Sequence, residues 1–208
     1  MAVRIHAEAP LPQKPYPLPE HERLWHAVAA MTFAWANVEN GAVMLLNSAL
    51  RSDESGMAPA IFFAPAHLDS RLAILNRVME VFASNHRSSA ALIWQGWETC
   101  LSGLRKQKEV RNKVAHGQIT HLAINGKTYV RLTGPIFDTH KSRIGLANKQ
   151  VPGMSAHDIE KSVEAVLASI NIMHLLGNAV QAVHKADAAT LRQTLPAIES
   201  YLKNQPRK

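Results

Sequence analysis

Residues 111–117, with the sequence RNKVAHG, bring together three groups that can act on a phosphodiester. Cleavage of RNA without a metal needs a group that moves protons and a cation that stabilises charge on the phosphate. His116 can move protons because an imidazole titrates near neutral pH. Arg111 supplies a permanent, forked cation, and the amide of Asn112 can hold a phosphate or a water. The segment therefore has the side chains that a metal-independent ribonuclease requires.

The same segment is also an ordinary way for a helix to end. Gly117 is typical of the position just after a helix C-terminus, and basic side chains are common in a last turn. An Arg and a His five positions apart also occur often by chance. The spacing alone therefore indicates the place of a site and does not establish its chemistry.

Basic residues are concentrated around this segment. The whole chain has a net charge of +7, whereas residues 105–149 contain ten Lys and Arg against two acids. A basic excess of this kind favours an anionic partner, and RNA or a nucleotide is the partner we expect. The alternative is that these side chains only solvate an exposed helix face. The candidate nucleic-acid-binding residues are Arg105, Lys106, Lys108, Lys113, Arg131, Lys141 and Arg143.

Glu39 is an acid on an otherwise apolar stripe of the first predicted helix. As a functional group it would orient His116 or pair with Arg111. As a structural group it would neutralise a buried arginine, because an unpaired buried charge is costly. Both interpretations predict a contact between Glu39 and either Arg111 or His116.

Apolar periodicity predicts the helices that position these residues. They cover about 20–50, 66–84, 88–116, 155 to about 180, and 188–203, and residues 51–65 are predicted to be a loop. Trp94, Trp97 and Cys100 are expected in the core rather than in a site. The inward stripe predicted for the first helix comprises Trp25, Val28, Thr32, Trp35, Glu39, Ala42 and Leu46.

Local signals set several boundaries. Asn125-Gly126 between β-prone runs at 119–124 and 128–132 predicts a hairpin. Ser155 with Asp158 resembles a capping box, and Asp187 is a candidate N-cap. Pro196 predicts a kink or a break in the last helix. We expect an all-α, up-and-down antiparallel bundle of four to five helices over 20–204, with this hairpin and a loop inserted at about 118–154, after a proline-rich arm over 1–19.

Several classes of site are not expected. A single cysteine cannot form an intramolecular disulfide, and no Cys/His spacing typical of a metal site occurs, so we expect neither metal nor cofactor. No run of 18 apolar residues predicts a membrane span, and the N-terminus lacks the apolar stretch of a secretory signal. A cytoplasmic location follows as the expectation.

Arg111-Asn112 followed by His116 resembles the Arg-x4-6-His motif of the HEPN superfamily. Residues 35–39, running from Trp35 to Glu39, are similar to a first-helix Trp-x-x-x-Glu of many bacterial relatives. The resemblance covers roughly residues 20–185, with specific matches only in these two segments. The insertion at 118–154 departs from the minimal domain.

The resemblance implies a helical bundle and a metal-independent endoribonuclease, in some members toxin- or defence-related with an antitoxin-type protein partner. It implies a two-fold homodimer in which Arg and His of both subunits form one cleft. Arg111 would stabilise phosphate charge, His116 would be general acid or base, Asn112 would position substrate, and Glu39 would support them. Helix positions five apart differ by about 140° in azimuth, which favours a contribution from a second subunit. Two alternatives stay open: a non-catalytic HEPN-like nucleotide- or protein-binding module, and a purely structural helical dimer.

Overall fold

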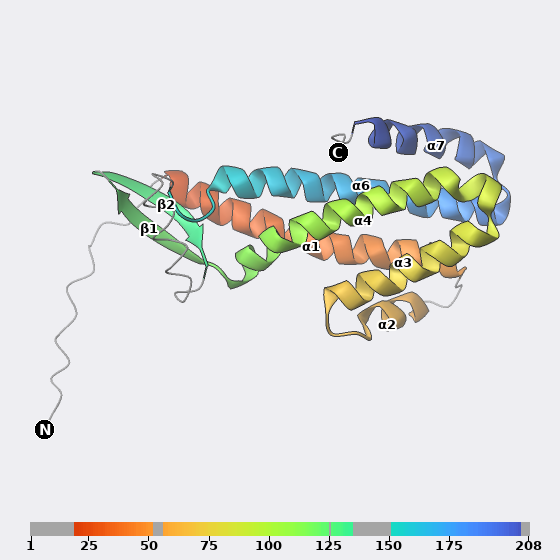
Figure 1. The fold of residues 1–208 in the computed structure, drawn as a ribbon, viewed down its shortest axis with the longest axis horizontal. Coiled ribbons are helices and arrows are strands. Elements are labelled where there is room, and N and C mark those ends of the chain that lie inside the picture. The colour runs from red at the N-terminus through yellow and green to blue at the C-terminus, as the bar shows by residue number, and fades with distance from the viewer. Residues whose placement is uncertain (1–18, 52–55, 125, 135–150, 205–208) are drawn as a thin grey trace, which may run out of the picture.

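The computed structural model describes residues 19–51, 56–124, 126–134 and 151–204. These ranges are mostly helical, with one two-stranded antiparallel sheet, so the all-α class is confirmed (Figure 1). Residues 1–18 of the predicted arm and residues 135–150 of the predicted insertion lie outside the described residues. The elements are α1 (Pro19–Leu50), α2 (Met57–Phe63), α3 (Leu68–Asn85), α4 (Arg87–His116), β1 (Gln118–Ile124), β2 (Lys127–Thr133), α6 (Ala156–Lys185) and α7 (Ala188–Lys203).

The two longest neighbours, α1 and α6, run side by side in the same direction (Figure 1). Near their starts, Arg23 forms an ion pair with Glu160. Near their ends, the guanidinium of Arg51 donates a hydrogen bond to the backbone carbonyl of His184 at 3.1 Å. The arrangement therefore differs from a strict up-and-down bundle, in which adjacent helices are antiparallel.

The short helix α2 explains part of this difference. It lies within residues 51–65, which were predicted to be a loop, so that prediction was wrong. Pro59 is the third residue of α2, and a proline is tolerated in a first turn because its missing N–H would have no helical partner there. Ala58 and Phe62 are four residues apart, so they lie on one face of the helix, and both are buried. The segment leads the chain back along the bundle, so α3 starts again beside the middle of α1.

The core confirms some side-chain predictions and corrects others. Trp97 and Cys100 are fully buried, as expected. Burial raises the pKa of the Cys100 thiol to about 12, so the group stays protonated and unreactive. In α1, however, Trp25 is 55% exposed and Leu24 is buried instead. The predicted positions Trp35, Ala42 and Leu46 are buried, but the stripe as a whole is offset because α1 buries a wide face against α3, α4 and α6 at once. The buried residues of α1 are Leu24, Ala27, Met31, Ala34, Trp35, Val38, Gly41, Ala42, Leu45, Leu46 and Ser48.

The predicted hairpin is confirmed. Ile124 pairs with Lys127, so two residues form the turn, and Gly126 has a φ of 75°, which glycine adopts without strain. Leu132 of β2 also forms a backbone bridge with Met154, just before α6. The hairpin is therefore attached at one end to α4 and at its edge to the start of α6.

The predicted helix starts at Ser155 and Asp187 are also confirmed. The Ser155 hydroxyl accepts from the backbone N–H of Asp158, whose carboxylate in turn accepts from the Ser155 backbone N–H. Asp187 accepts from the backbone N–H groups of Ala189 and Thr190. Pro196 does not break α7, which continues through it to Lys203.

Replacement of Ser155 by Ala is expected to lower the free energy of unfolding by about 1 kcal/mol at pH 7, the usual contribution of such a cap. Hydrogen bonds from the Ser155 hydroxyl and backbone hold the pKa of the Asp158 carboxyl below its usual range. The stability that the ionised Asp158 carboxylate contributes is present above its unfolded pKa of about 3.9, and it is lost as the pH falls below that value toward the lower folded pKa. Urea unfolding at pH 7 and at acid pH should therefore show a difference that shrinks in acid. Ser162→Ala, which removes a hydroxyl that donates to the Asp158 carbonyl and leaves the Ser155 cap in place, is the control.

The helix α6 is long and apolar enough to cross a membrane by length and composition alone. More than half of its apolar window is buried against the rest of the chain. Core helices of soluble proteins have the same composition, so α6 is consistent with a soluble protein.

Candidate functional site

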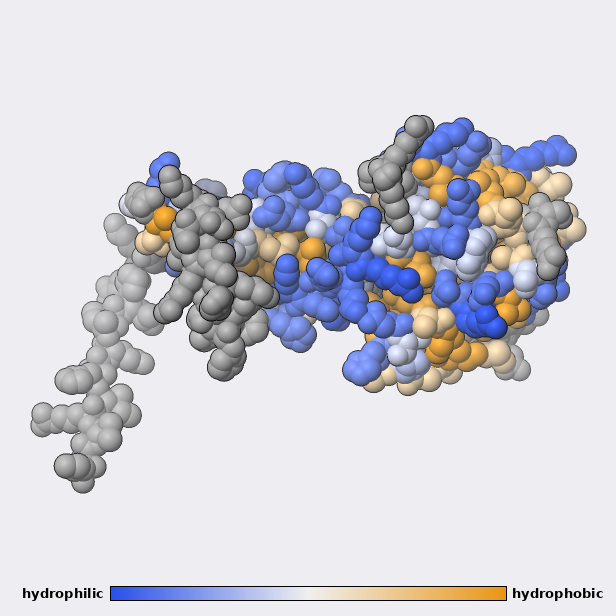
Figure 2. Space-filling view, in the orientation of Figure 1, coloured by the Kyte–Doolittle hydropathy of each residue, from blue (hydrophilic) through white to orange (hydrophobic). Residues whose placement is uncertain are grey.

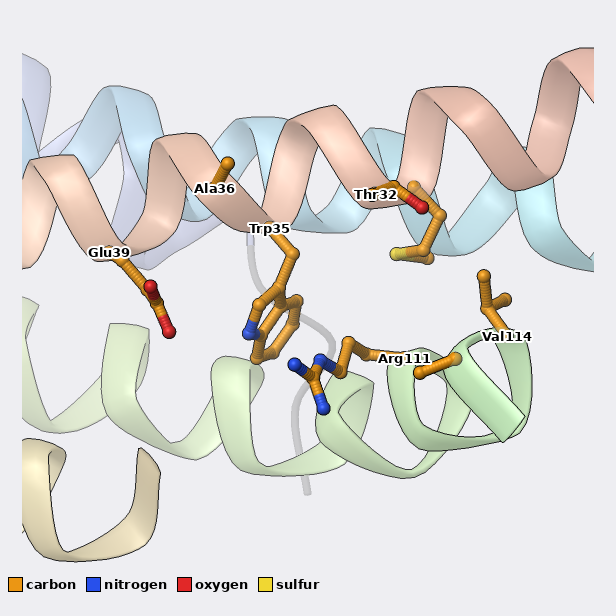
Figure 3. Close-up of a pocket in the computed structure, with 8 residues that line it drawn as sticks. Thr32, Trp35, Ala36, Glu39, Arg111 and Val114 are labelled. Carbon is orange, nitrogen blue, oxygen red and sulfur yellow. The ribbon is translucent and has the colours of Figure 1, made fainter. Parts of the chain in front are cut away.

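A cavity of about 270 Å³ lies between α1 and α4 and is lined by two of the predicted catalytic residues, Arg111 and Glu39 (Figure 3). On α4 its lining residues are spaced three and four apart, which places them on one face of the helix. On α1 the facing residues repeat in the same way. The lining residues are Met31, Thr32, Trp35, Ala36, Glu39, Arg111, Val114 and Ala115.

Arg111 is half-buried at this cavity, in the second-last turn of α4. Its guanidinium donates to the side-chain oxygen of Asn112 at 3.2 Å. Within the described ranges, no carboxylate forms an ion pair with it. Asn112 therefore orients the arginine without neutralising its charge, and the cation keeps N–H donors for another acceptor.

Glu39 lines the same cavity but pairs with Arg71, at 3.1 Å. The predicted ion pair or hydrogen bond with Arg111 or His116 is therefore wrong. Arg71 is also tied to the preceding loop, because it donates to the carbonyl of Pro65 at 2.9 Å and lies over the ring of Phe63. It reaches Glu39 because the first turn of α3 lies beside the middle of α1. The structural interpretation of Glu39, in which it neutralises a buried arginine, therefore applies to Arg71 and not to Arg111.

Trp35 lies between Glu39 and Arg111 in Figure 3, with its indole nitrogen on the side of Glu39. The residue is only 4% exposed, and its indole N–H has no acceptor among the residues that the structure describes. An unpaired buried donor is uncommon, because it forgoes a hydrogen bond that water would supply. Sequence reasoning identified this residue as part of a family motif but not as an unsatisfied donor.

His116 lies outside the cavity, exposed at the last position of α4. The structure thus brings Arg111 and Asn112 together, while His116 is displaced from the cavity around the helix axis. This separation agrees with the difference in azimuth expected for positions five apart.

Gly117 is the one residue between α4 and β1, and it has a φ of −83°, which is not the left-handed conformation expected of a helix-ending glycine. Its importance is close approach. A Cβ added there would lie 2.5 Å from the carbonyl oxygen of Lys113 and 2.9 Å from that of Thr133. Since both neighbours are backbone atoms, no side chain fits between α4 and β2 at this position.

The candidate nucleic-acid-binding residues fall into three groups. Lys108 pairs with Asp69, and Arg131 pairs with Glu20 with its side chain only 15% exposed. Lys141 and Arg143 lie outside the described residues. Figure 2 shows hydrophilic side chains over the middle of the visible face, where α4 crosses in Figure 1. The exposed basic side chains of α4 with no ion pair in the described part of the chain are Arg105, Lys106 and Lys113.

No three His, Cys, Asp or Glu side chains lie close enough to hold a metal ion within the described ranges. Comparisons of the chain with protein-family models, with curated proteins and with solved structures found no match. The function must therefore be argued from the residues themselves.

Proposed function

We propose that this chain is a HEPN-like, metal-independent endoribonuclease whose site is shared between two copies in a homodimer. The observation that carries the proposal is Arg111, a half-buried cation with no acidic partner in the described residues, five residues before an exposed His116. A retained charge beside a cavity is suited to stabilising a phosphate as negative charge builds on it. A toxin- or defence-related role in the cytoplasm, with an antitoxin-type partner, belongs to this proposal.

The chemistry requires two proton transfers. The 2′-hydroxyl of the RNA loses its proton and forms a bond to phosphorus, while the bond from phosphorus to the 5′-oxygen breaks and that oxygen gains a proton. In each of two equivalent arrangements, His116 of one subunit acts on a phosphate that Arg111 of the other subunit holds. This imidazole accepts the proton of the 2′-hydroxyl as a base, and the imidazolium that forms donates a proton to the leaving 5′-oxygen as an acid. Arg111 stabilises the charge on the phosphate, and Asn112 holds the guanidinium in place. Glu39 acts indirectly, because its ion pair with Arg71 fixes one end of the cavity.

Exposed apolar side chains beside the cavity support a homodimer. Phe33 is 73% exposed and Met44 is 59% exposed, and they lie about three turns apart on one face of α1. Phe33 is one turn from Ala36, which lines the cavity. Burial of such side chains by a second copy would be favourable. It would also bring a second His116 toward the region of Arg111.

The test is cleavage of labelled RNA in excess chelator by the full-length protein. Cleavage by the wild-type protein that is lost in Arg111→Ala and in His116→Ala supports the enzyme. The matched controls are Arg192→Ala and His174→Ala, which remove exposed side chains on α7 and α6. Equal cleavage by all five proteins would indicate a contaminating nuclease and contradict the site.

A second function is favoured by one observation. The cavity with Arg111, Glu39 and Trp35 is built within a single chain and does not include His116. A non-catalytic nucleotide-binding module would need only this cavity. Nucleotide binding that depends on Arg111, without any RNA cleavage, would select it over the enzyme.

A further inference from the structure

The cavity between α1 and α4 contains two opposite charges. Glu39 lies at one end, and the guanidinium of Arg111 lies on the other side of the Trp35 indole, with Thr32 and Val114 farther along the cavity (Figure 3). The remaining walls are largely apolar, contributed by Met31, Ala36, Val114 and Ala115. A complementary ligand is partly apolar and flat, and it has hydrogen-bond acceptors on one edge and donors on the adjoining edge.

The hydrogen-bonding groups of the cavity are only partly used. One carboxylate oxygen of Glu39, Oε1, accepts from Arg71, and the other, Oε2, has no partner among the described residues. Arg111 uses one terminal nitrogen on Asn112. The indole N–H of Trp35 has no acceptor in the described part of the chain. The cavity therefore has one anionic acceptor and two kinds of donor that no described residue uses in a hydrogen bond.

Guanine is the nucleobase that matches these groups. Its O6 and N7 are adjacent acceptors that an arginine can bind with two parallel hydrogen bonds. Its N1–H and exocyclic amine are donors on the neighbouring edge, where a carboxylate oxygen can accept them. Adenine has an amine in place of O6, and cytosine and uracil lack N7. The cavity volume of about 270 Å³ corresponds to roughly nine water molecules, which is ample for one bicyclic base.

We propose that this cavity binds a guanine base, either in an RNA next to the bond that is cut or in a free guanine nucleotide. Arg111 binds O6 and N7 with two of its five N–H groups, Asn112 holds a third, and two remain for the phosphate of an RNA. Oε2 of Glu39 accepts from the other edge of the base. The indole nitrogen of Trp35 has an exposed area of less than 1 Å², so it reaches the base only when the indole edge turns toward the cavity. The RNA source rests on the proposed ribonuclease function, whereas guanine binding itself does not.

The test is titration of the full-length wild-type protein in excess chelator, followed by calorimetry. GMP is expected to bind at least about tenfold more tightly than AMP, CMP or UMP, the discrimination usual for a well-formed bidentate contact. IMP lacks the exocyclic amine and 7-deaza-GMP lacks N7, so each should bind several-fold more weakly than GMP. Equal binding of the four nucleotides, or binding of none, would overturn the proposal.

The two sources of the base are distinguished by measuring the binding of uncleavable 2′-O-methyl oligonucleotides. One oligonucleotide carries a single G, and the other carries A at the same position. Tighter binding of the G oligonucleotide than of GMP identifies RNA as the source, and equal binding identifies the free nucleotide. RNA cleavage with no guanine preference would overturn this proposal alone. Guanine binding without cleavage would overturn the ribonuclease alone.

Variants test the residues. Glu39→Gln should reduce the preference for GMP over AMP, whereas Glu164→Gln, which removes the charge of an exposed carboxylate on α6, should keep the ratio. Trp35→Phe should abolish the change in tryptophan emission on binding, and Trp25→Phe should not. A Glu39→Gln protein that folds by circular dichroism and keeps the preference would contradict the assignment. If this variant does not fold, binding of IMP and GMP to the wild-type protein tests the same contact, and equal affinity for the two would contradict the role of Glu39.

Discussion

RNA cleavage is expected to fall by about two to four orders of magnitude in either Arg111→Ala or His116→Ala, and to return in part when the two variants are combined. The loss follows from the usual contributions of a general acid or base and of a cation that stabilises the transition state. Neither variant alone has both groups. A dimer with one chain of each type has one arginine and one histidine, on opposite subunits.

The expected recovery can be estimated from the two-fold symmetry. Random pairing makes about half of the dimers mixed, and each mixed dimer keeps one of two equivalent arrangements, so roughly a quarter of the wild-type rate should return. The measurement is RNA cleavage by variants combined by coexpression or by unfolding and refolding together. Arg111→Ala combined with the double variant is the control, because no productive dimer can form. Recovery in the control, or none in the test mixture, contradicts a shared site.

Replacement of Trp97 by Ala is expected to lower the free energy of unfolding by about 3–5 kcal/mol, as for other large buried aromatic side chains. Trp97 is fully buried, and its indole N–H donates to the side-chain oxygen of Asn76 at 3.0 Å. The substitution leaves a cavity between α3 and α4 and removes the donor for Asn76. The measurement is equilibrium unfolding in urea, with two probes to test for a single transition.

Two further variants separate the causes. Trp97→Phe keeps most of the packing but removes the donor, so it should cost less, about 1–3 kcal/mol. Trp25→Ala removes the same type of side chain at a position that is 55% exposed, and its effect should stay below about 1 kcal/mol. An alanine effect at Trp97 no larger than that at Trp25 would mean that this part of the core is not packed as described.

The elements that were predictable from sequence are those set by local chemistry. The turn at Gly126 needs only two residues between β-prone runs, and the cap at Ser155 needs only a hydroxyl three residues before an acid. Both depend on neighbours in the chain, so the sequence contains the whole interaction. Arg111 and Asn112 were placed correctly at the end of α4 for the same reason.

The features that were not predictable depend on contacts between distant segments. Glu39 requires a cationic partner, but nothing in the sequence distinguishes Arg71 from Arg111, because the choice depends on where α3 crosses α1. The stripe of α1 was offset because three helices pack on it, and a single-face pattern does not describe such a helix. The parallel course of α1 and α6 depends on the return of the chain through α2. The unsatisfied nitrogen of Trp35 is a property of packing alone.

The close contact at Gly117 has a mechanical consequence. Because one residue joins α4 to β1, and even a Cβ at that residue would collide with the backbone of Thr133, no flexible linker separates His116 from the hairpin. A displacement of β1 and β2 relative to α4 therefore displaces the imidazole as well. The position of His116 is consequently set by the hairpin as much as by its own helix. A ligand or protein that contacts only the hairpin can therefore shift His116 relative to Arg111 without touching either side chain.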